Sequence, residues 1–196
     1  MTIRSAKSAI RADALRRRAS VDASLPSAFG AALAILGPDL ARQSAKRDRA
    51  AVSVFLPIRD EPDTLPLIAA LTGSGLRTAL PATPPRGEPL RFRAWGLGDP
   101  TVPGRFGTVE PAPDAPELNP DVLFVPLAAF DRRGYRLGYG AGYYDGALRR
   151  LRQLKPIVAV GVAFAVQEVD AVPTEPHDER LDAVVTENGL VTFGST

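Results

Sequence analysis

Hydrophobic residues recur at helical spacing in several segments of the chain. In the clearest of them, Phe29, Leu33, Leu36 and Leu40 follow one another at the spacing of a single buried stripe. A proline stands in the first turn of that segment, where its missing N–H is not needed. The pattern predicts helices over residues 5–19, 26–42, 64–71 and 143–154.

Short apolar runs between these helices predict β-strands. Residues 122–125 are apolar at every position, which is typical of a strand buried on both faces. Residues 90–95 instead alternate apolar and polar positions, as in a half-exposed strand. The predicted strands are 51–56, 78–81, 90–95, 122–125, 157–163, 184–185 and 190–193. Their alternation with helices favours an α/β fold with a largely parallel sheet.

Ligands of such folds bind beyond the carboxyl ends of the strands. We therefore expect the chemistry in the loops after four strand ends, Leu56, Trp95, Val125 and Ala163. Residues 96–120 form a long Gly/Pro-rich connection, and residues 126–142 form a second irregular stretch. A loop as long as the first is usually functional or flexible.

The chain of 196 residues is long enough for one compact domain with a hydrophobic core. It contains no cysteine and one histidine, His177, which excludes disulfides, thiol nucleophiles and metal sites built on cysteine or several histidines. The longest apolar run, residues 122–130, is far shorter than the roughly 20 residues that cross a membrane. The N-terminus lacks the apolar segment of a secretory signal. We therefore expect a cytoplasmic protein with no membrane partner.

Positive charge is concentrated in the first part of the chain. Residues 1–50 carry ten Lys or Arg against four Asp or Glu, whereas the remainder carries fourteen against eighteen. This basic end could attract a phosphate, a polyglutamate or a nucleic acid, or it could form a solvated helix face. Residues 5–19 also have the Arg-rich, acid-poor composition of a mitochondrial transit peptide. The charge pattern alone leaves these alternatives open.

The segment DRRGYRLGYGAGYYD, residues 131–145, holds the densest group of chemically active residues. Its alternating glycines free the backbone to turn several N–H groups toward one point, and the helix that follows adds its positive end. Arg136 supplies a full charge suited to phosphate, and Asp145 could hold a Mg²⁺ ion that bridges phosphates. These parts could form a polyphosphate site, although such glycine spacing alone more often marks a tight structural turn.

The segment RLGYGAGYYD, residues 136–145, resembles the signature of the 5-formyltetrahydrofolate cyclo-ligase family, also called 5,10-methenyltetrahydrofolate synthetases. Further segments match the family pattern in order and spacing: Lys7 with Arg11, LPIRDEPDT, LRFRAW, FGTVEP, GVAFAVQ and HDERLDAVVTE. The resemblance therefore spans nearly the whole chain. It implies a three-layer α/β/α sandwich around a mostly parallel, Rossmann-like sheet, with residues 1–196 as a single domain.

The resemblance also implies a reaction. Members of the family convert 5-formyltetrahydrofolate to 5,10-methenyltetrahydrofolate with MgATP and release ADP and phosphate. The γ-phosphoryl group of ATP activates the formyl oxygen, and the N10 amine then attacks the activated carbon. Such a transfer relies on positioning and electrostatic stabilisation, which a chain without cysteine can provide. The implied ligands are ATP, Mg²⁺ and the folate, with or without a polyglutamate tail, and we expect a monomer that binds no nucleic acid.

Site residues follow from the same resemblance. Lys7 and Arg11 would contact the ATP phosphates, and one helical turn separates them, so both can point the same way. Asp145 and Asp182 would bind Mg²⁺. The phosphates would be wrapped by Arg136, Leu137, Gly138, Tyr139, Gly140, Ala141, Gly142, Tyr143 and Tyr144.

On the folate side, the resemblance implies contacts from Leu56, Glu61 and Trp95. Trp95 could stack on a flat ring or belong to the core. Arg136 and Tyr143 would take part in catalysis. The loop residues that face the folate would be Tyr139, Gly140, Ala141, Gly142 and Tyr143.

Two positions depart from the family pattern. Ala141 stands where the family usually has Gly, Lys or another basic residue, and Gly146 stands where a basic residue is common. Arg132, Arg133 and Arg149 could compensate for the missing phosphate contacts. Otherwise the departures favour a non-catalytic regulator that binds folate or nucleotide and retains the pocket. RNA binding by the basic N-terminal helix is a third interpretation, although aromatic residues for base stacking are scarce there.

Overall fold

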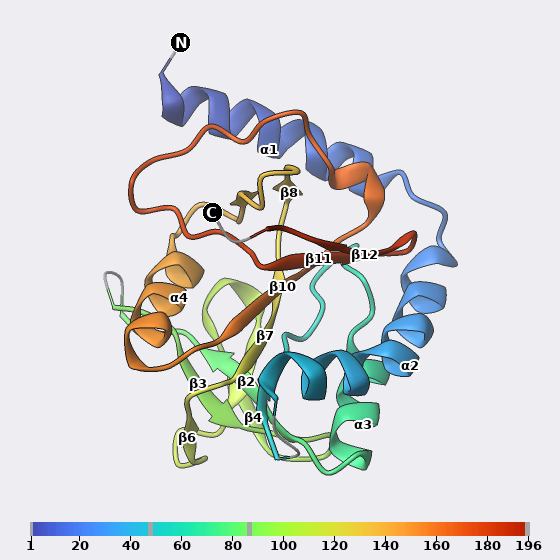
Figure 1. Ribbon diagram of the computed structural model, residues 1–196, viewed down its shortest axis with the longest axis vertical. Coiled ribbons are helices and arrows are strands. Elements are labelled where there is room, and N and C mark those ends of the chain that lie inside the picture. Colours follow the sequence, from blue (N-terminus) through green and yellow to red (C-terminus); the bar gives the residue numbers. More distant parts are fainter. Residues whose placement is uncertain (1, 47–48, 86–87, 195–196) are drawn as a thin grey trace.

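The computed structural model describes residues 2–46, 49–85 and 88–194 (Figure 1). The helices are α1 (Ile3–Ala19), α2 (Leu25–Ala45), α3 (Leu65–Gly73) and α4 (Tyr143–Leu154), with 3₁₀ turns at Arg105–Gly107 and Ala165–Gln167. The strands are β1 (Ala51–Ser53), β2 (Arg77–Ala82), β3 (Arg91–Ala94), β4 (Thr101–Pro103), β5 (Val109–Pro111), β6 (Glu117–Leu118), β7 (Val122–Pro126), β8 (Ala129–Phe130), β9 (Arg136–Leu137), β10 (Val158–Val162), β11 (Ala183–Thr186) and β12 (Gly189–Thr192).

Eight of these strands form one sheet, in the order β12-β11-β10-β7-β1-β2-β3-β6. The central strands from β11 to β2 are parallel, and the outer strands β12, β3 and β6 run antiparallel to their neighbours. Val122 and Phe124 of β7 join one hydrophobic core, whereas Leu123 and Val125 join another on the opposite face. Both faces of β7 are therefore buried, which explains its unbroken apolar sequence. The predicted α/β fold with a mostly parallel sheet is confirmed.

Helices cover the two faces of the sheet. α2 and α3 pack on one face with Phe29, Leu33 and Leu67, and α4 packs on the other with Leu148 and Leu151. Figure 1 shows the sheet between α4 on one side and α2 with α3 on the other, which gives the three expected layers. In the part of the chain that is described, no helix is both long and apolar enough to cross a membrane.

α1 crosses the edge at which the parallel strands end, which we call the carboxyl edge (Figure 1). Ala14, in the middle of this helix, is fully buried with Ala129, Leu137 and Val172 in a small core of its own. One face of the basic N-terminal segment is therefore packed against the fold. Its polar side chains reach the loops that follow β1 and β9.

All four helices lie within three residues of their predicted ends. The two stretches expected to be irregular contain further pairing, because β4 pairs with β5 and β8 pairs with β9. β3 runs antiparallel to β2 and therefore ends at the edge opposite to the carboxyl edge. The prediction that the loop after Trp95 lies at the carboxyl edge with the other three loops assumed a parallel strand and is wrong.

Candidate functional site

A glycine loop, residues 138–142, joins β9 to α4 at the carboxyl edge. Gly140 and Gly142 have φ angles of 102° and 70°, in the left-handed region that residues with a Cβ rarely adopt. α4 starts from Gly142, and among the described residues no side chain caps its first turn. Backbone N–H groups at a helix start, together with the helix dipole, attract anions. The loop and the start of α4 therefore offer backbone donors that suit an anion.

Two cations of α1 were expected to face this loop. Arg11 Nε donates to the Gly138 carbonyl at 2.6 Å, so its guanidinium lies on the loop. Lys7, one turn earlier, donates instead to Asp178 Oδ2 at 2.6 Å and to Glu175 Oε2 at 2.8 Å. Burial alone would lower the pKa of Lys7, but the bonds to Asp178 and Glu175 outweigh it and the pKa is raised. α1 thus brings Arg11 to the loop and holds Lys7 charged in an ion pair.

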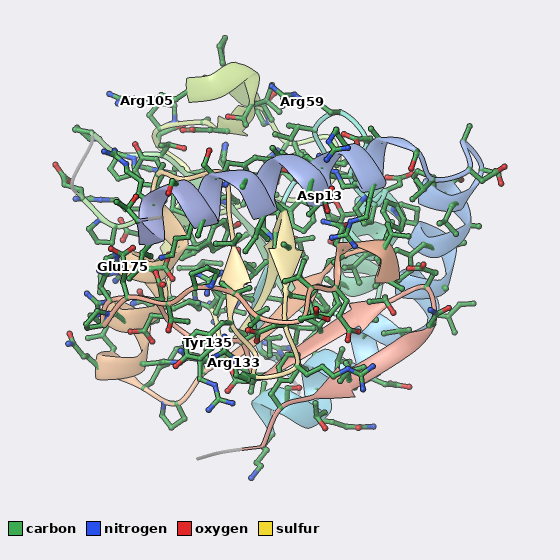
Figure 2. All side chains as sticks on the ribbon, turned by 90° about the horizontal axis from the view of Figure 1, so that it is seen from above. Asp13, Arg59, Arg105, Arg133, Tyr135 and Glu175 are labelled. Atoms are coloured by element: carbon green, nitrogen blue, oxygen red, sulfur yellow. The ribbon has the colours of Figure 1, made fainter. Side chains whose placement is uncertain are left out.

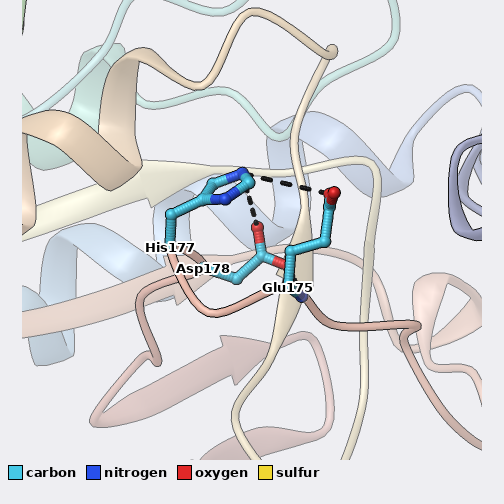
Figure 3. Close-up of side chains that lie close together, drawn as sticks. All are labelled: Glu175, His177 and Asp178. Atoms are coloured by element: carbon cyan, nitrogen blue, oxygen red, sulfur yellow. Dashed lines mark hydrogen bonds and ion pairs between the residues drawn. The ribbon is translucent and has the colours of Figure 1, made fainter.

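Glu175, His177 and Asp178 form the cluster that receives Lys7 (Figure 3). One ligand atom from each lies within 4.8 Å of the other two, a spacing that a metal ion could bridge. His177 Nε2 lies 3.8 Å from Asp178 Oδ1 and 3.9 Å from Glu175 Oε2. The Lys7 ammonium already pairs with both carboxylates and offsets part of their charge without a metal. We assign the cluster as the anchor of the first turns of α1.

Arg136 and Asp145 form an ion pair between β9 and α4. Arg136 Nη2 lies 2.9 Å from Asp145 Oδ1, and Arg136 Nη1 donates to the Glu179 carbonyl. The Glu179 amide donates to the same Asp145 oxygen at 3.0 Å. Burial lowers the pKa of Arg136, and Asp145 opposes that shift. Asp145 is partly exposed, has a second carboxylate oxygen and stands beside the glycine loop, so its chemistry fits a Mg²⁺ ion that also binds phosphate.

Asp182, the other carboxylate expected to bind Mg²⁺, lies at the opposite edge of the sheet, just before β11. Its Oδ2 accepts hydrogen bonds from the Ala159 amide at 2.7 Å and from Arg152 at 3.1 Å. Arg152 follows Asp145 on α4 by seven residues, or about 10 Å along a helix axis. The structure therefore does not bring the two carboxylates together, and Asp182 ties the start of β11 to β10 and α4.

A cavity of about 260 Å³ opens where the glycine loop meets α4. It is lined by Glu88, Pro89, Ala141, Gly142, Tyr143, Gly146, Arg149, Arg150 and Gln153. Both positions that depart from the family pattern, Ala141 and Gly146, therefore border it. A Cβ at Gly146 would lie 3.5 Å from Pro89, in ordinary contact, so packing does not require glycine there. Arg149 and Arg150 give the cavity a positive wall in spite of the two departures.

A second group of polar side chains meets next to the glycine loop, in which Arg18 and Glu61 are buried whereas Tyr139 and Asp60 are partly exposed. Tyr139, from the loop, donates its hydroxyl hydrogen to Glu61 Oε1, and the Ile58 amide donates to Glu61 Oε2 at 3.0 Å. Arg18, from α1, donates to the Tyr139 hydroxyl at 2.7 Å and to Asp60 Oδ1 at 3.0 Å. The loop after β1, the glycine loop and α1 thus meet at Glu61, the expected folate contact.

Burial controls the ionisation of this group. It is the largest influence on Glu61 and raises the pKa of that carboxyl, although Tyr139, the Ile58 amide and Arg18 favour the charged form. Burial also raises the pKa of Tyr139, and the charge of Glu61 adds to that shift. The phenol therefore stays protonated and acts as a hydrogen-bond donor toward Glu61.

Arg18 is a site residue that the sequence analysis did not identify. From the sequence it is one of three consecutive arginines near the end of a helix, yet its side chain is only 1% exposed. A usable signal is present, because Lys7, Arg11, Ala14 and Arg18 follow at i, i+4, i+7 and i+11, which is the spacing of one helix face. The face of α1 that carries the expected phosphate contacts therefore continues to Arg18.

The two tyrosines at the start of α4 pack partly against the core below that helix. Tyr143 also lines the cavity at the glycine loop. The Tyr144 hydroxyl is shielded from solvent and has no hydrogen-bond partner within the described chain. Burial raises the pKa of Tyr144, the charge of Glu61 adds to the shift and Arg136 opposes it. This unsatisfied hydroxyl is therefore in the field of both the expected folate residue and the expected phosphate residue.

The remaining expected folate contacts, Leu56 and Trp95, lie at different ends of the sheet. Leu56 shares the loop of Glu61 and packs partly buried on the core. Trp95 is 7% exposed within that core and lines a separate cavity of about 340 Å³, and its indole N–H donates to the Asp99 carbonyl at 3.1 Å. The backbone amide of Trp95 donates to the Thr78 carbonyl, which places Trp95 beside the start of β2. The structure therefore assigns Trp95 to the core and separates it from the glycine loop.

Two of the arginines expected to compensate for Ala141 and Gly146 belong to the β8–β9 hairpin instead. Arg132 Nε lies 2.6 Å from Glu168 Oε1, and Arg133 pairs with Asp131 at 2.7 Å. Figure 2 shows Arg133 next to Tyr135 on this hairpin, with the guanidinium 5.3 Å from the ring centre. Both arginines are committed to holding the hairpin. Arg149 lines the cavity, but it is engaged as well, because its Nε lies 3.3 Å from Glu179 Oε1 and its Nη2 donates to the His177 carbonyl at 2.5 Å.

Comparison with known proteins gives consistent matches. Residues 3–187 match the model of the 5-formyltetrahydrofolate cyclo-ligase family. The chain is 39% identical over 140 residues to the 5-formyltetrahydrofolate cyclo-ligase of Escherichia coli K12, a match that covers 69% of this chain and 76% of that protein. It is 35% identical over 153 residues to the enzyme of the same name from Mycolicibacterium smegmatis, covering 72% of this chain and 76% of that protein.

Solved structures agree with this assignment. The 5,10-methenyltetrahydrofolate synthetase of Aquifex aeolicus superposes with a TM-score of 0.70 at 26% identity, covering 97% of this chain and 94% of that one. The synthetase of Mycoplasma pneumoniae, at 20% identity, also has a TM-score of 0.70 and covers 91% of this chain and 96% of that one, which supports the fold. The sequence, the sheet order and these matches agree: the chain belongs to the 5-formyltetrahydrofolate cyclo-ligase family.

Proposed function

We propose that this chain converts 5-formyltetrahydrofolate to 5,10-methenyltetrahydrofolate, with ATP and Mg²⁺ as cofactors and ADP and phosphate as products. One observation carries the proposal. Tyr139 of the glycine loop hydrogen-bonds to Glu61, while Arg11 of α1 donates to the same loop and α4 starts from it. A single short loop therefore joins a site suited to phosphates to a buried carboxylate suited to a pterin.

The reaction must turn an amide-like oxygen into a leaving group. The formyl oxygen attacks the γ-phosphorus of ATP, the bond from that phosphorus to the bridging oxygen breaks, and ADP leaves. The N10 amine then attacks the formyl carbon, the carbon–oxygen bond breaks, and phosphate departs while N10 gives up its proton. The chain contributes position and charge to both steps, which are the main components of catalysis in phosphoryl transfer.

Phosphate binding would fall to the start of α4, Arg11 and Arg136. The N–H groups of the first helical turn and two guanidinium groups suit the terminal phosphates of ATP. Asp145 would hold the Mg²⁺ ion, which neutralises phosphate charge when it is bound. Asp182 is not part of this proposal, because it is engaged at the other end of α4.

Folate binding would fall to Glu61, Leu56 and Tyr139. A buried carboxylate accepts N–H donors such as those along the edge of a pterin ring, and its burial strengthens each such bond. Leu56 supplies apolar surface on the same loop. Tyr143 would line the region shared by the two ligands, since it borders the cavity at the glycine loop.

A non-catalytic binding protein is the second candidate, and one observation favours it. Ala141 and Gly146 leave two positions of the cavity wall without the basic side chains common in the family. Such a protein would be stabilised by folate or by nucleotide without turning either over. The single domain, the monomeric state, the cytoplasmic location and the acceptance of polyglutamylated folate stay predictions from the sequence.

An absorbance assay for methenyltetrahydrofolate tests the proposal directly. The purified protein is mixed with 5-formyltetrahydrofolate and MgATP, and ATP and Mg²⁺ are each omitted in parallel. A rise in product that requires both supports the enzyme. Ligand-dependent thermal stabilisation without any product supports the binding protein, and Ala141 and Gly146 would then be the first positions to change to basic residues.

A further inference from the structure

We propose that Arg18 is a positioning residue of the folate site, which orients Glu61 and Tyr139 and so makes folate affinity depend on α1. The inference rests on the proposed function and adds to it a residue that the phosphate and folate assignments do not include. Its basis is the placement of a buried cation against three groups of the site.

Arg18 reaches every member of the polar group around Glu61. Its Nη1 donates to the Tyr139 hydroxyl at 2.7 Å and lies 3.6 Å from Glu61 Oε1. Its Nη2 donates to Asp60 Oδ1 at 3.0 Å. The guanidinium carbon also lies 5.9 Å from the centre of the Tyr139 ring. One planar side chain thus touches the loop after β1 and the glycine loop together.

The neighbours of Arg18 show that this burial is not a general property of the helix end. Arg16 pairs with Asp13 on the surface with 78% of its side chain exposed, and Arg17 is 38% exposed. The Arg18 side chain is 1% exposed. Burying a guanidinium carries a desolvation cost that a surface position avoids, and an apolar residue would fill the same space without that cost. A buried charge at this position is therefore better explained by what it holds than by stability.

The groups that face Glu61 come from four elements. They are Arg18 on α1, Tyr139 on the glycine loop, Tyr144 on α4, and Asp60 beside it on its own loop. Of these Arg18 supplies the positive charge, and it compensates two adjacent carboxylates at once. Without it, Glu61 would take up a proton more readily, because burial and Asp60 both favour the neutral form. Tyr139 would also lose one of the two hydrogen bonds that fix its hydroxyl.

This placement leads to a specific kinetic expectation. A folate that hydrogen-bonds to Glu61 depends on the charge and the orientation of that carboxylate. Because Arg18 supports both, loss of Arg18 should weaken folate binding. The proposed ATP side depends on Arg11, Arg136 and the start of α4, and among the described residues Arg18 forms no hydrogen bond or ion pair with these groups. The KM for folate and the KM for ATP should therefore respond differently.

The test compares Arg18→Met, Arg18→Lys and the surface control Arg16→Met in the full chain. We expect Arg18→Met to raise the KM for 5-formyltetrahydrofolate at least about tenfold, with less than about threefold change for ATP, because charge-assisted hydrogen bonds are lost on one side only. The acidic limb of kcat/KM for folate should move to higher pH in Arg18→Met and return toward wild type in Arg18→Lys. Arg16→Met should behave as wild type in both measurements.

Melting temperatures separate this role from a purely structural one. If Arg18→Met does not fold, the double variant Arg18→Met/Glu61→Gln removes the orphaned charge and is measured in its place, against Glu61→Gln alone. The inference is overturned if a folded Arg18 variant keeps the wild-type KM for folate and the wild-type pH profile, or if both KM values rise equally.

If the wild type binds 5-formyltetrahydrofolate without turnover, the proposed reaction fails, and folate-induced thermal stabilisation then tests Arg18 by the same comparison. If the wild type neither binds nor converts the folate, both proposals fail.

Discussion

Replacing Tyr144 with phenylalanine tests whether the hydroxyl at the start of α4 serves the substrates. In the free protein this hydroxyl is shielded from solvent and unpaired among the described residues, so it has lost water without gaining a partner. A buried polar group in that state costs about 1–3 kcal/mol. Tyr144→Phe removes the hydroxyl and keeps the ring, so we expect the free energy of unfolding to rise by about 1 kcal/mol, at the low end of that range. For a domain of this size, the melting temperature should rise by roughly 2–4 °C.

Tyr139→Phe is the matched control, because its hydroxyl has partners. That hydroxyl donates to Glu61 and accepts from Arg18 at 2.7 Å. Its removal leaves a buried carboxylate and a buried guanidinium each short of one hydrogen bond, a loss of about 1–3 kcal/mol. The two phenylalanine variants should therefore shift the melting temperature in opposite directions, although each changes a single atom.

Both variants should lower activity. Since Tyr144 lies in the field of Glu61 and Arg136, a bound substrate is expected to complete its missing hydrogen bond. Losing such a bond should reduce kcat/KM for folate by about tenfold, which corresponds to about 1.4 kcal/mol. Steady-state rates of methenyltetrahydrofolate formation and thermal melting curves of the same preparations provide the two readouts. A Tyr144→Phe protein that melts below wild type, or one that turns over at the wild-type rate, would refute the reasoning.

Three further predictions concern single residues of the site. Asp145→Asn should abolish Mg²⁺-dependent turnover. It should also lower the melting temperature, because it leaves the buried Arg136 without its carboxylate. If the dependence of the rate on Mg²⁺ concentration is unchanged, Asp145 is not the ligand. Lys7→Met should lower the melting temperature, because it leaves Glu175 and Asp178 without the cation that holds the first turns of α1; a melting temperature equal to that of wild type would contradict the anchoring role. The pKa of Glu61 is raised above its ordinary 4.5, so stability from its neutral form is present below that pH and is lost as pH rises through the folded-state pKa. The free energy of unfolding of Glu61→Gln should therefore increase relative to that of wild type as the pH rises above about 4.5. Denaturant unfolding of both proteins at several pH values measures this difference. A difference that does not change with pH would argue against a raised pKa of Glu61.

The sequence predicted those parts of the fold that depend on local pattern. The bounds of α4 follow from its helical period and from the glycine before it, and both signals lie within the segment itself. The direction of β3 could not be predicted, because alternation of apolar and polar residues is the same in parallel and antiparallel strands. That single difference moves Trp95 from the carboxyl edge to the opposite one.

The candidate site shows the same division between local and long-range information. The positive φ angles of Gly140 and Gly142 agree with a glycine pattern read directly from the chain. The burial of Arg18 depends on Asp60 and Tyr139, which stand 42 and 121 residues away along the chain. Local patterns carry no information on such distances, and a run of three arginines by itself favours a solvated surface.

α1 gives the two halves of the site a common support. Arg11 and Arg18 are seven residues apart on one face of the helix, which corresponds to about 10 Å along its axis. Between them Ala14 is fully buried, so the helix lies close to the loops it contacts. Phosphoryl transfer requires the reacting atoms to approach within about 3–3.5 Å, and small displacements of either ligand are costly. A rigid helix that contacts the proposed phosphate end through Arg11 and the proposed folate end through Arg18 would fix the distance between those two ends, and this gives a reason for the packing of one face of α1 against the loops at the carboxyl edge.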